Sequence, residues 1–217
     1  MIRLVLFGRQ GAGKGTQASM LSEHYKAPHI STGDMLREAV AEGTAVGTRV
    51  RAILDAGELV PDETMLEVIK DRLDHDDVQQ HGFLLDGFPR TVGQAKSLLK
   101  ITVVDLAVDL DVPEGLVLDR ISSRRVCQQG HIYTVGDHAA QSGVCPVDGT
   151  PVVQRDDDTP DAVTARLDAY KVKTAVAMAY FDSQGLLLTV DGVGDPETVF
   201  HRLVSAIDER LDNDARW

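Results

Sequence analysis

The chain has 217 residues, of which 43% are hydrophobic and 26% charged, a composition typical of a globular protein with a sizeable core. Its formal charge of −12 excludes a general attraction to nucleic acid or anionic membranes, so any phosphate site must concentrate its cations locally. The apolar start at residues 2–7 is too short for a secretory signal, and no apolar run is long enough to span a membrane. We therefore predict a cytoplasmic protein.

Short apolar and β-branched runs recur along the chain, with helical patterns between them. They predict strands at residues 2–7, 29–31, 82–85, 103–110 and 186–190. Proline beside acidic residues predicts helix starts at about 61, 113, 160 and 196, the third helix running to about 182. Residues 208–217 are expected to be a frayed acidic end. Alternating strands and helices favour an α/β fold with a parallel sheet covered on both faces.

The first apolar run leads directly into the glycine-rich segment Gly8 to Thr16. A strand that ends in such a loop before a helix directs backbone N–H groups and a helix N-terminus at one point, which suits a polyphosphate. Lys14 adds a positive charge, and Thr16 offers a hydroxyl for magnesium. The spacing fits the P-loop pattern, although Gly15 stands where Ser or Thr usually follows the lysine. We predict a nucleotide phosphate site rather than an incidental glycine-rich turn.

Two segments interrupt the alternation of strand and helix. Residues 31–60 are helical with no strand, and residues 123–158 are largely polar and rich in glycine. Both would lie beyond the carboxyl ends of strands, where a doubly wound sheet binds its ligand. We predict that they are insertions able to close over a site, so that residues 1–30, 61–122 and 159–217 form the core domain. The alternative is that both segments are surface loops without a function.

Several motifs then occur in one order: Gly13 to Gln17, Ser31 to Arg37, Phe83 to Gln94, and Gln154 to Arg166. In order and spacing they resemble the adenylate kinase family, in its long-lid, zinc-type bacterial form. The resemblance implies the P-loop nucleoside monophosphate kinase fold, a five-stranded parallel sheet flanked by helices, with an AMP-binding segment at 31–60 and a lid at 123–158. It also implies a monomeric enzyme, an ATP:AMP phosphotransferase that uses Mg²⁺ and forms ADP.

The resemblance further implies which residues hold each nucleotide. The ATP-binding set is Gly11, Ala12, Gly13, Lys14, Gly15, Thr16, Arg120, Arg124, Ile132, Tyr133 and Gly194. The AMP-binding set is Thr32, Gly33, Arg37, Glu58, Leu59, Val60, Gly87, Phe88, Pro89, Arg90, Gln94, Arg155 and Arg166. The catalytic set is Lys14, Asp86, Arg90, Arg124, Arg155 and Arg166. Thr32 and Gln94 would read the base, because a carboxamide offers the donor and acceptor that an adenine edge requires.

The predicted chemistry needs no catalytic base. The attacking phosphate oxygen has a second pKa of about 6 and is already mostly ionised at neutral pH. Catalysis would therefore consist of positioning and electrostatics, with arginine forks offsetting the repulsion between two anions. Asp86 would reach magnesium through water. The Phe88–Pro89 bond is similar to the cis peptide of the family.

The cysteines of the chain, Cys127 and Cys145, both lie in the second insertion. Because the chain shows no export signal, we do not expect the two cysteines to form a structural disulfide. We predict instead that they bind a metal. With His131 and Asp148 they resemble the metal-binding knuckles of the lid, although the usual second cysteine is absent. Such a mixed donor set suits zinc, which would be structural because the shell is closed. A lid that has lost its metal is the alternative.

Two further expectations concern single positions. The family commonly has proline where this chain has Gln10, and we expect binding to survive that departure because proline donates no N–H. Asp157 and Asp158 would pair with lid arginines on closure, or else form a solvated acidic turn.

Two other functions are alternatives to an adenylate kinase. A kinase for another nucleoside monophosphate, UMP or CMP, would share the phosphate clamps, but Thr32 and Gln94 favour AMP. A P-loop ATPase or nucleotide-sensing protein would have no reason to place Arg37, Arg90 and Gln94 together.

Overall fold

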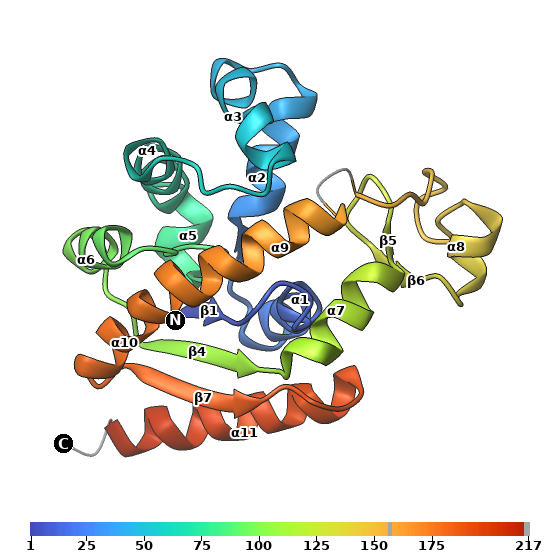
Figure 1. Ribbon diagram of the computed structural model, residues 1–217. Coiled ribbons are helices and arrows are strands. Elements are labelled where there is room, and N and C mark those ends of the chain that lie inside the picture. The colour runs from blue at the N-terminus through green and yellow to red at the C-terminus, as the bar shows by residue number, and fades with distance from the viewer. Residues whose placement is uncertain (156–157, 215–217) are drawn as a thin grey trace.

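A five-stranded parallel sheet forms the centre of the computed structural model, which describes residues 1–155 and 158–214 (Figure 1). The strand order is β2-β3-β1-β4-β7, and the strands are β1 (Ile2–Phe7), β2 (His29–Ser31), β3 (Gly82–Asp86), β4 (Leu106–Asp111) and β7 (Leu187–Asp191). Val5 of β1 lies opposite both Leu85 and Ala107, so the central strand is paired on both edges. The predicted α/β fold class is confirmed.

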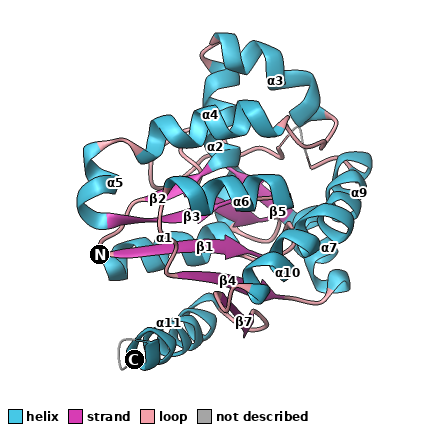
Figure 2. Cartoon of the chain, turned by 90° about the vertical axis from the view of Figure 1, so that its left-hand side faces the viewer, coloured by secondary structure: helices cyan, strands magenta, loops and turns pink. Residues whose placement is uncertain are grey.

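Helices cover both faces of the sheet (Figure 2). Because successive strand residues point to opposite faces, Leu4 and Leu6 belong to one buried core and Val5 and Phe7 to the other. The first core is completed by α1 (Lys14–Tyr25), α7 (Glu114–Ser123) and α11 (Pro196–Asp214). The second is completed by α4 (Asp62–Leu73), α6 (Val92–Ile101) and α10 (Ala175–Ser183).

The structure corrects several predicted boundaries. Strand β4 begins at Leu106 rather than residue 103, because Val103 is 62% exposed and Asp105 turns to accept from the Arg3 N–H at 2.7 Å. The segment after Thr159 is helical but includes a π-helical turn, Tyr170–Thr174, between α9 (Pro160–Ala169) and α10. The short helix α5 (Asp76–His81) was not predicted.

The prediction of a frayed end is wrong for residues 208–214, because α11 continues to Asp214. Leu203, Ile207 and Leu211 recur every fourth residue and pack against the first core. Tyr25 of α1 donates its hydroxyl to Asp208 at 2.8 Å, which ties the two helices together.

The first interrupting segment is a helical hairpin, α2 (Thr32–Ala41) and α3 (Ala45–Asp55), which projects at the top of Figure 1. Ser31 caps α2 and Thr44 caps α3, each accepting a backbone N–H with its hydroxyl. A Cβ on Gly47 would lie 1.9 Å from the Ala39 carbonyl oxygen, so only glycine permits this approach of α2 and α3.

The second segment carries the antiparallel pair β5 (Arg124–Val126) and β6 (Ile132–Thr134), followed by α8 (His138–Ser142), on the right of Figure 1. Its buried cluster is small, consisting of Cys127, Ala139, Cys145 and Val152. None of the helices in the described part of the chain combines the length and the apolar character of a membrane span.

Candidate active site

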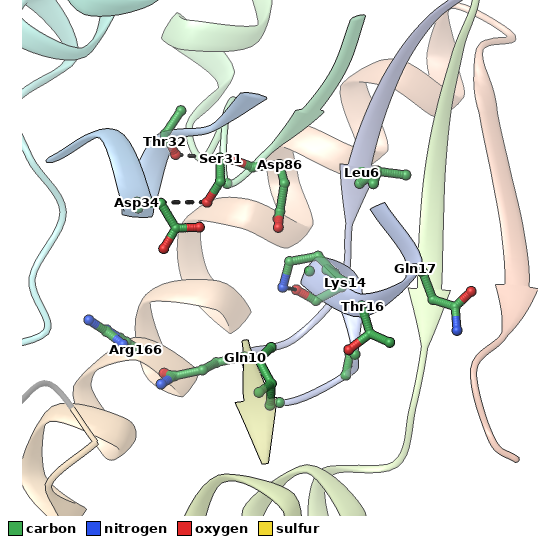
Figure 3. A pocket seen from close by; sticks show the side chains of 18 of the residues that line it. Leu6, Gln10, Lys14, Thr16, Gln17, Ser31, Thr32, Asp34, Asp86 and Arg166 are labelled. Atoms are coloured by element: carbon green, nitrogen blue, oxygen red, sulfur yellow. Dashed lines mark hydrogen bonds between the residues drawn. The ribbon is translucent and has the colours of Figure 1, made fainter. Parts of the chain in front are cut away.

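A cavity of about 870 Å³ lies at the carboxyl ends of the strands, between the two interrupting segments. Every residue of the predicted ATP-binding, AMP-binding and catalytic sets lines it. Figure 3 shows Lys14 and Thr16 on the side of the glycine-rich loop, with Asp86, Thr32 and Asp34 facing them. The two predicted halves are therefore one continuous space.

The glycine-rich loop has the backbone that only glycine adopts readily. Gly11 and Gly13 have φ angles of +80° and +99°, and a Cβ on Gly11 would lie 2.7 Å from the Val117 carbonyl oxygen. Arg120 donates to the Ala12 carbonyl oxygen at 3.0 Å and so braces the loop against α7. The loop thus ends at the N-terminus of α1, and the N-terminal end of a helix favours an anion, although the Ala12 N–H itself donates to the Arg9 carbonyl oxygen at 3.1 Å.

Lys14 stands at the beginning of α1 and reaches back over the loop. Its Nζ donates to the carbonyl oxygens of Gly8 at 2.8 Å and Arg9 at 3.1 Å. Burial lowers the pKa of Lys14 and the charges of Arg90 and Arg124 add to this, whereas Asp86 opposes it. The ammonium is therefore a desolvated charge, which strengthens its attraction for phosphate.

Asp86 is the last residue of strand β3, and its side chain faces Lys14 (Figure 3). Burial raises the pKa of Asp86, but the nearby His29 ring, 3.7 Å away, and the charge of Lys14 outweigh burial and hold the pKa below its ordinary value. The carboxyl group is therefore ionised at neutral pH and available to a cation.

The segment after β3 shapes the other half of the cavity. The Phe88–Pro89 bond is cis, as the resemblance implied. Thr32 donates to the Asp86 carbonyl oxygen at 3.2 Å, and a Cβ on Gly87 would lie 2.6 Å from the Thr32 hydroxyl. Arg90 Nε donates to the Gly87 carbonyl oxygen at 2.7 Å, which fixes the direction of its guanidinium.

Asp34 joins the two interrupting segments across the cavity, a role that the sequence did not predict. It accepts from Arg37 at 2.5 Å and lies 3.8 Å from Arg155. Burial raises the pKa of Asp34, but the charge of Arg37 and the hydrogen bond from Ser31 lower it below the ordinary value. A carboxylate thus stands beside two arginines of the predicted AMP-binding set.

Asp158 holds Arg124 in place. Arg124 Nε donates to Asp158 Oδ2 at 2.9 Å, and a second guanidinium nitrogen donates to Oδ1. The side chain of Asp158 is fully buried, and Gln10 Nε2 donates to its Oδ1 at 3.1 Å. The predicted pairing of Asp158 with an arginine of the second interrupting segment is confirmed, while Asp157 lies outside the described residues.

Cys127, His131, Cys145 and Asp148 form a compact cluster in the second segment. Their potential ligand atoms all lie within 4.8 Å of one another, and Cys127 Sγ is 3.2 Å from His131 Nδ1 and 3.0 Å from Asp148 Oδ2. Both cysteines are free thiols. The predicted metal-ligating residues are therefore brought together, and they form a group able to hold a metal.

Comparison with known proteins agrees with this geometry. A family model described as adenylate kinase matches residues 6–186. An adenylate kinase of Methanosarcina mazei is 42% identical over 212 residues, covering 95% of this chain and 98% of that protein. An adenylate kinase of Clostridium acetobutylicum is 40% identical over 215 residues, covering 96% and 100%. The chain belongs to the adenylate kinase family.

Membership of the adenylate kinase family confirms the predicted activity, transfer of a phosphoryl group from ATP to AMP to give ADP. The chain is thus an enzyme, a transferase that uses Mg²⁺ with ATP, as adenylate kinases do. A kinase for UMP or CMP is not favoured, and neither is an ATPase or sensor.

Tyr170 is a cavity residue of this adenylate kinase that sequence reasoning missed. It lies in the π-helical turn, and its hydroxyl donates to Asp109 at 3.3 Å while Arg9 lies over its ring at 5.6 Å. Burial and then Asp111 raise the pKa of Asp109 above its ordinary value. A π-helical turn is common at functional sites but leaves no spacing signal that could have revealed it.

Gln10 makes a contact that proline, common here in adenylate kinases, would lack. We expect Gln10→Pro and Gln10→Ala to raise the KM for ATP about two- to fivefold, because Asp158 loses a donor and holds Arg124 less firmly. Steady-state kinetics with both substrates would measure this, and the KM for AMP should change less. Equal KM values for ATP in both variants and in the wild type would remove any role for this contact.

Proposed function

We propose that the chain performs its adenylate kinase reaction by holding ATP and AMP end to end in the one cavity. Residues 31–60 would serve as the AMP-binding segment, residues 123–158 as a lid, and residues 1–30, 61–122 and 159–217 as the core domain. The observation that carries this proposal is that both predicted nucleotide sets line one continuous space.

On the ATP side, the glycine-rich loop would surround the β-phosphate and Lys14 would bridge to the transferred group. Support comes from the loop geometry and from the desolvated ammonium of Lys14. Ile132 and Tyr133 would border the base from β6, and Gly194 would border it from beyond β7. Thr16 and, through water, Asp86 would hold Mg²⁺, which would supply positive charge to offset that of the phosphates.

On the AMP side, Arg37 and Arg90 would hold the phosphate, and Thr32 and Gln94 would read the base. Support comes from their common position in the cavity beside Gly87. Asp34 would release Arg37 to the phosphate, since a dianion attracts a guanidinium more strongly than one carboxylate does.

The reaction itself would need no proton to be removed. The AMP phosphate attacks as an ionised oxygen, so catalysis consists of alignment and of charge offset by Lys14, Arg90 and the remaining arginines of the catalytic set. Movement of the lid would bring Arg124 and Arg155 over the phosphates and exclude water, which favours transfer to AMP over hydrolysis.

We further propose that the cysteine cluster holds a structural Zn²⁺. In a tetrahedral zinc site with bonds of about 2.0 to 2.3 Å, the ligand atoms lie about 3.3 to 3.8 Å apart. The contacts of Cys127 and Cys145 with His131 Nδ1, at 3.2 and 3.6 Å, approach this spacing. Two thiolates, one imidazole and one carboxylate also match zinc chemically. The metal would stiffen a segment whose own buried cluster is small.

Loss of the metal should destabilise the lid more than it impairs catalysis. We expect chelation, or Cys145→Ser, to lower the melting temperature by roughly 5 °C or more while activity at room temperature falls less. Val147→Ser is the matched control, because Val147 is 70% exposed in the same turn and offers no ligand. An unchanged melting curve together with no metal by elemental analysis would contradict the zinc proposal.

A substrate panel tests the preference for AMP. With ATP as donor, AMP should be turned over much faster than UMP, CMP or GMP, and ADP alone should disproportionate to ATP and AMP. Comparable or faster turnover of a pyrimidine nucleotide would overturn the assignment of Thr32 and Gln94. ATP hydrolysis without an acceptor would favour the ATPase alternative.

We also propose a monomer in the cytoplasm. The free thiols of Cys127 and Cys145 accord with a reducing compartment. Sedimentation at micromolar concentration should give a single species of 23.5 kDa.

A further inference from the structure

Asp62, in the first turn of α4, fixes one end of the Gln94 side chain. Gln94 Nε2 donates to Asp62 Oδ1 at 2.7 Å, and Thr91 donates its hydroxyl to Asp62 Oδ2 at 2.8 Å. A Cβ on Gly93 would lie 3.0 Å from Oδ2, so glycine leaves room for the carboxylate. The carboxylate is thus held between α4 and the start of α6.

The other end of the side chain is fixed by backbone. Gln94 Oε1 accepts from the Arg90 N–H at 2.7 Å, and the Gln94 N–H donates to the Thr91 hydroxyl at 3.1 Å. Gln94 is only 2% exposed. Both terminal atoms and the main chain of Gln94 therefore have fixed partners.

These partners permit one orientation of the amide. A carboxylate only accepts hydrogen bonds and a backbone N–H only donates them. If the Gln94 amide turned over, its oxygen would face the Asp62 carboxylate and its NH₂ group would face the Arg90 N–H. Two hydrogen bonds would then become two repulsive contacts, so the orientation is determined chemically.

The fixed amide still has capacity for a ligand. Nε2 retains a second hydrogen and Oε1 a second lone pair, and Gln94 lines the cavity. Adenine presents an amino donor beside a ring-nitrogen acceptor, whereas a 6-oxopurine presents an acceptor beside a donor. An amide that cannot turn over can match one of these patterns and opposes the other.

We propose that Asp62 is a positioning residue that gives the AMP site its selectivity for 6-aminopurines over 6-oxopurines, by holding the Gln94 amide in one orientation. The inference rests on the proposed function, in which Gln94 reads the base of AMP.

The test compares AMP with inosine monophosphate, which has the same shape but an oxo group at position 6. Asp62→Asn keeps the shape yet lets the amides turn, so the ratio of kcat/KM for AMP to that for inosine monophosphate should fall about tenfold or more. The KM for AMP should rise and the KM for ATP should stay within about twofold. Glu63→Gln is the control, because Glu63 lies exposed in the same helical turn and loses the same charge.

A second variant at the same position tests the role of Asp62 in case Asp62→Asn folds poorly. Asp62→Ser keeps a polar residue at the start of α4 but is too short to reach Gln94, and it should also lower the ratio. An unchanged ratio in both variants, or an equal loss of activity toward both nucleotides, would overturn the role of Asp62. Gln94→Ala separates this from the proposed function: if Gln94→Ala keeps the wild-type ratio, base reading by Gln94 itself is wrong.

Discussion

Lys14→Ala is expected to lower kcat roughly a thousandfold while the protein stays folded. The side chain brings a desolvated positive charge to the phosphates, and its present partners are carbonyl oxygens of the glycine-rich loop, not core groups. Alanine also suits a helix, so α1 should persist. Initial rates in both directions, with a circular dichroism melt, would measure the two effects.

The control for this variant is Lys100→Ala, which removes the same charge from an exposed position at the end of α6. It should retain the wild-type rate. Lys14→Arg should remain far below wild type, because a planar guanidinium does not take the place of a compact ammonium. A wild-type rate in Lys14→Ala would refute the bridging role.

Arg90→Ala is expected to lower kcat/KM for AMP by about a hundred- to a thousandfold. The guanidinium is directed by its hydrogen bond to the Gly87 carbonyl oxygen and lies near Lys14, where donor and acceptor phosphates would meet. Arg90 is proposed to hold the AMP phosphate both in the bound substrate and in the transition state. Its loss should therefore change both kcat and the KM for AMP.

Two further variants serve as comparisons for Arg90→Ala. Arg90→Lys keeps the charge but loses the planar fork, so it should recover only part of the activity. Arg49→Ala removes an exposed arginine of α3 and should leave the kinetics unchanged. An Arg90→Ala enzyme whose loss falls on ATP and not on AMP would place Arg90 on the wrong nucleotide.

Most of the sheet and the glycine-rich loop could be predicted because their signals are local. Apolar runs mark strands that are buried on both faces, and the strand, loop and helix order of Gly8 to Thr16 is contiguous. The same rule fails at Val103, which is apolar but exposed, and so the predicted strand began too early. In α11 the acidic composition obscured the apolar repeat of Leu203, Ile207 and Leu211.

The parts of the site that were missed depend on packing between distant segments. Asp62 precedes Gln94 by 32 positions and meets it because α4 packs beside α6. Asp34 lies within a recognised motif, but its approach to Arg155 depends on where the second segment sits. The cluster proposed to hold a metal could be predicted because its turns carry the two cysteines of the chain, and so rare a residue type is informative.

The central claim is that one cavity receives two nucleotides, aligned so that a phosphoryl group passes between them without meeting solvent. A crystal structure with a bisubstrate inhibitor, two adenosines joined through a chain of phosphates, tests it most directly. We expect one adenosine beside Ile132 and the other beside Gln94, with the phosphates running between Lys14 and Arg90. An inhibitor with only one adenosine in the cavity would contradict the account.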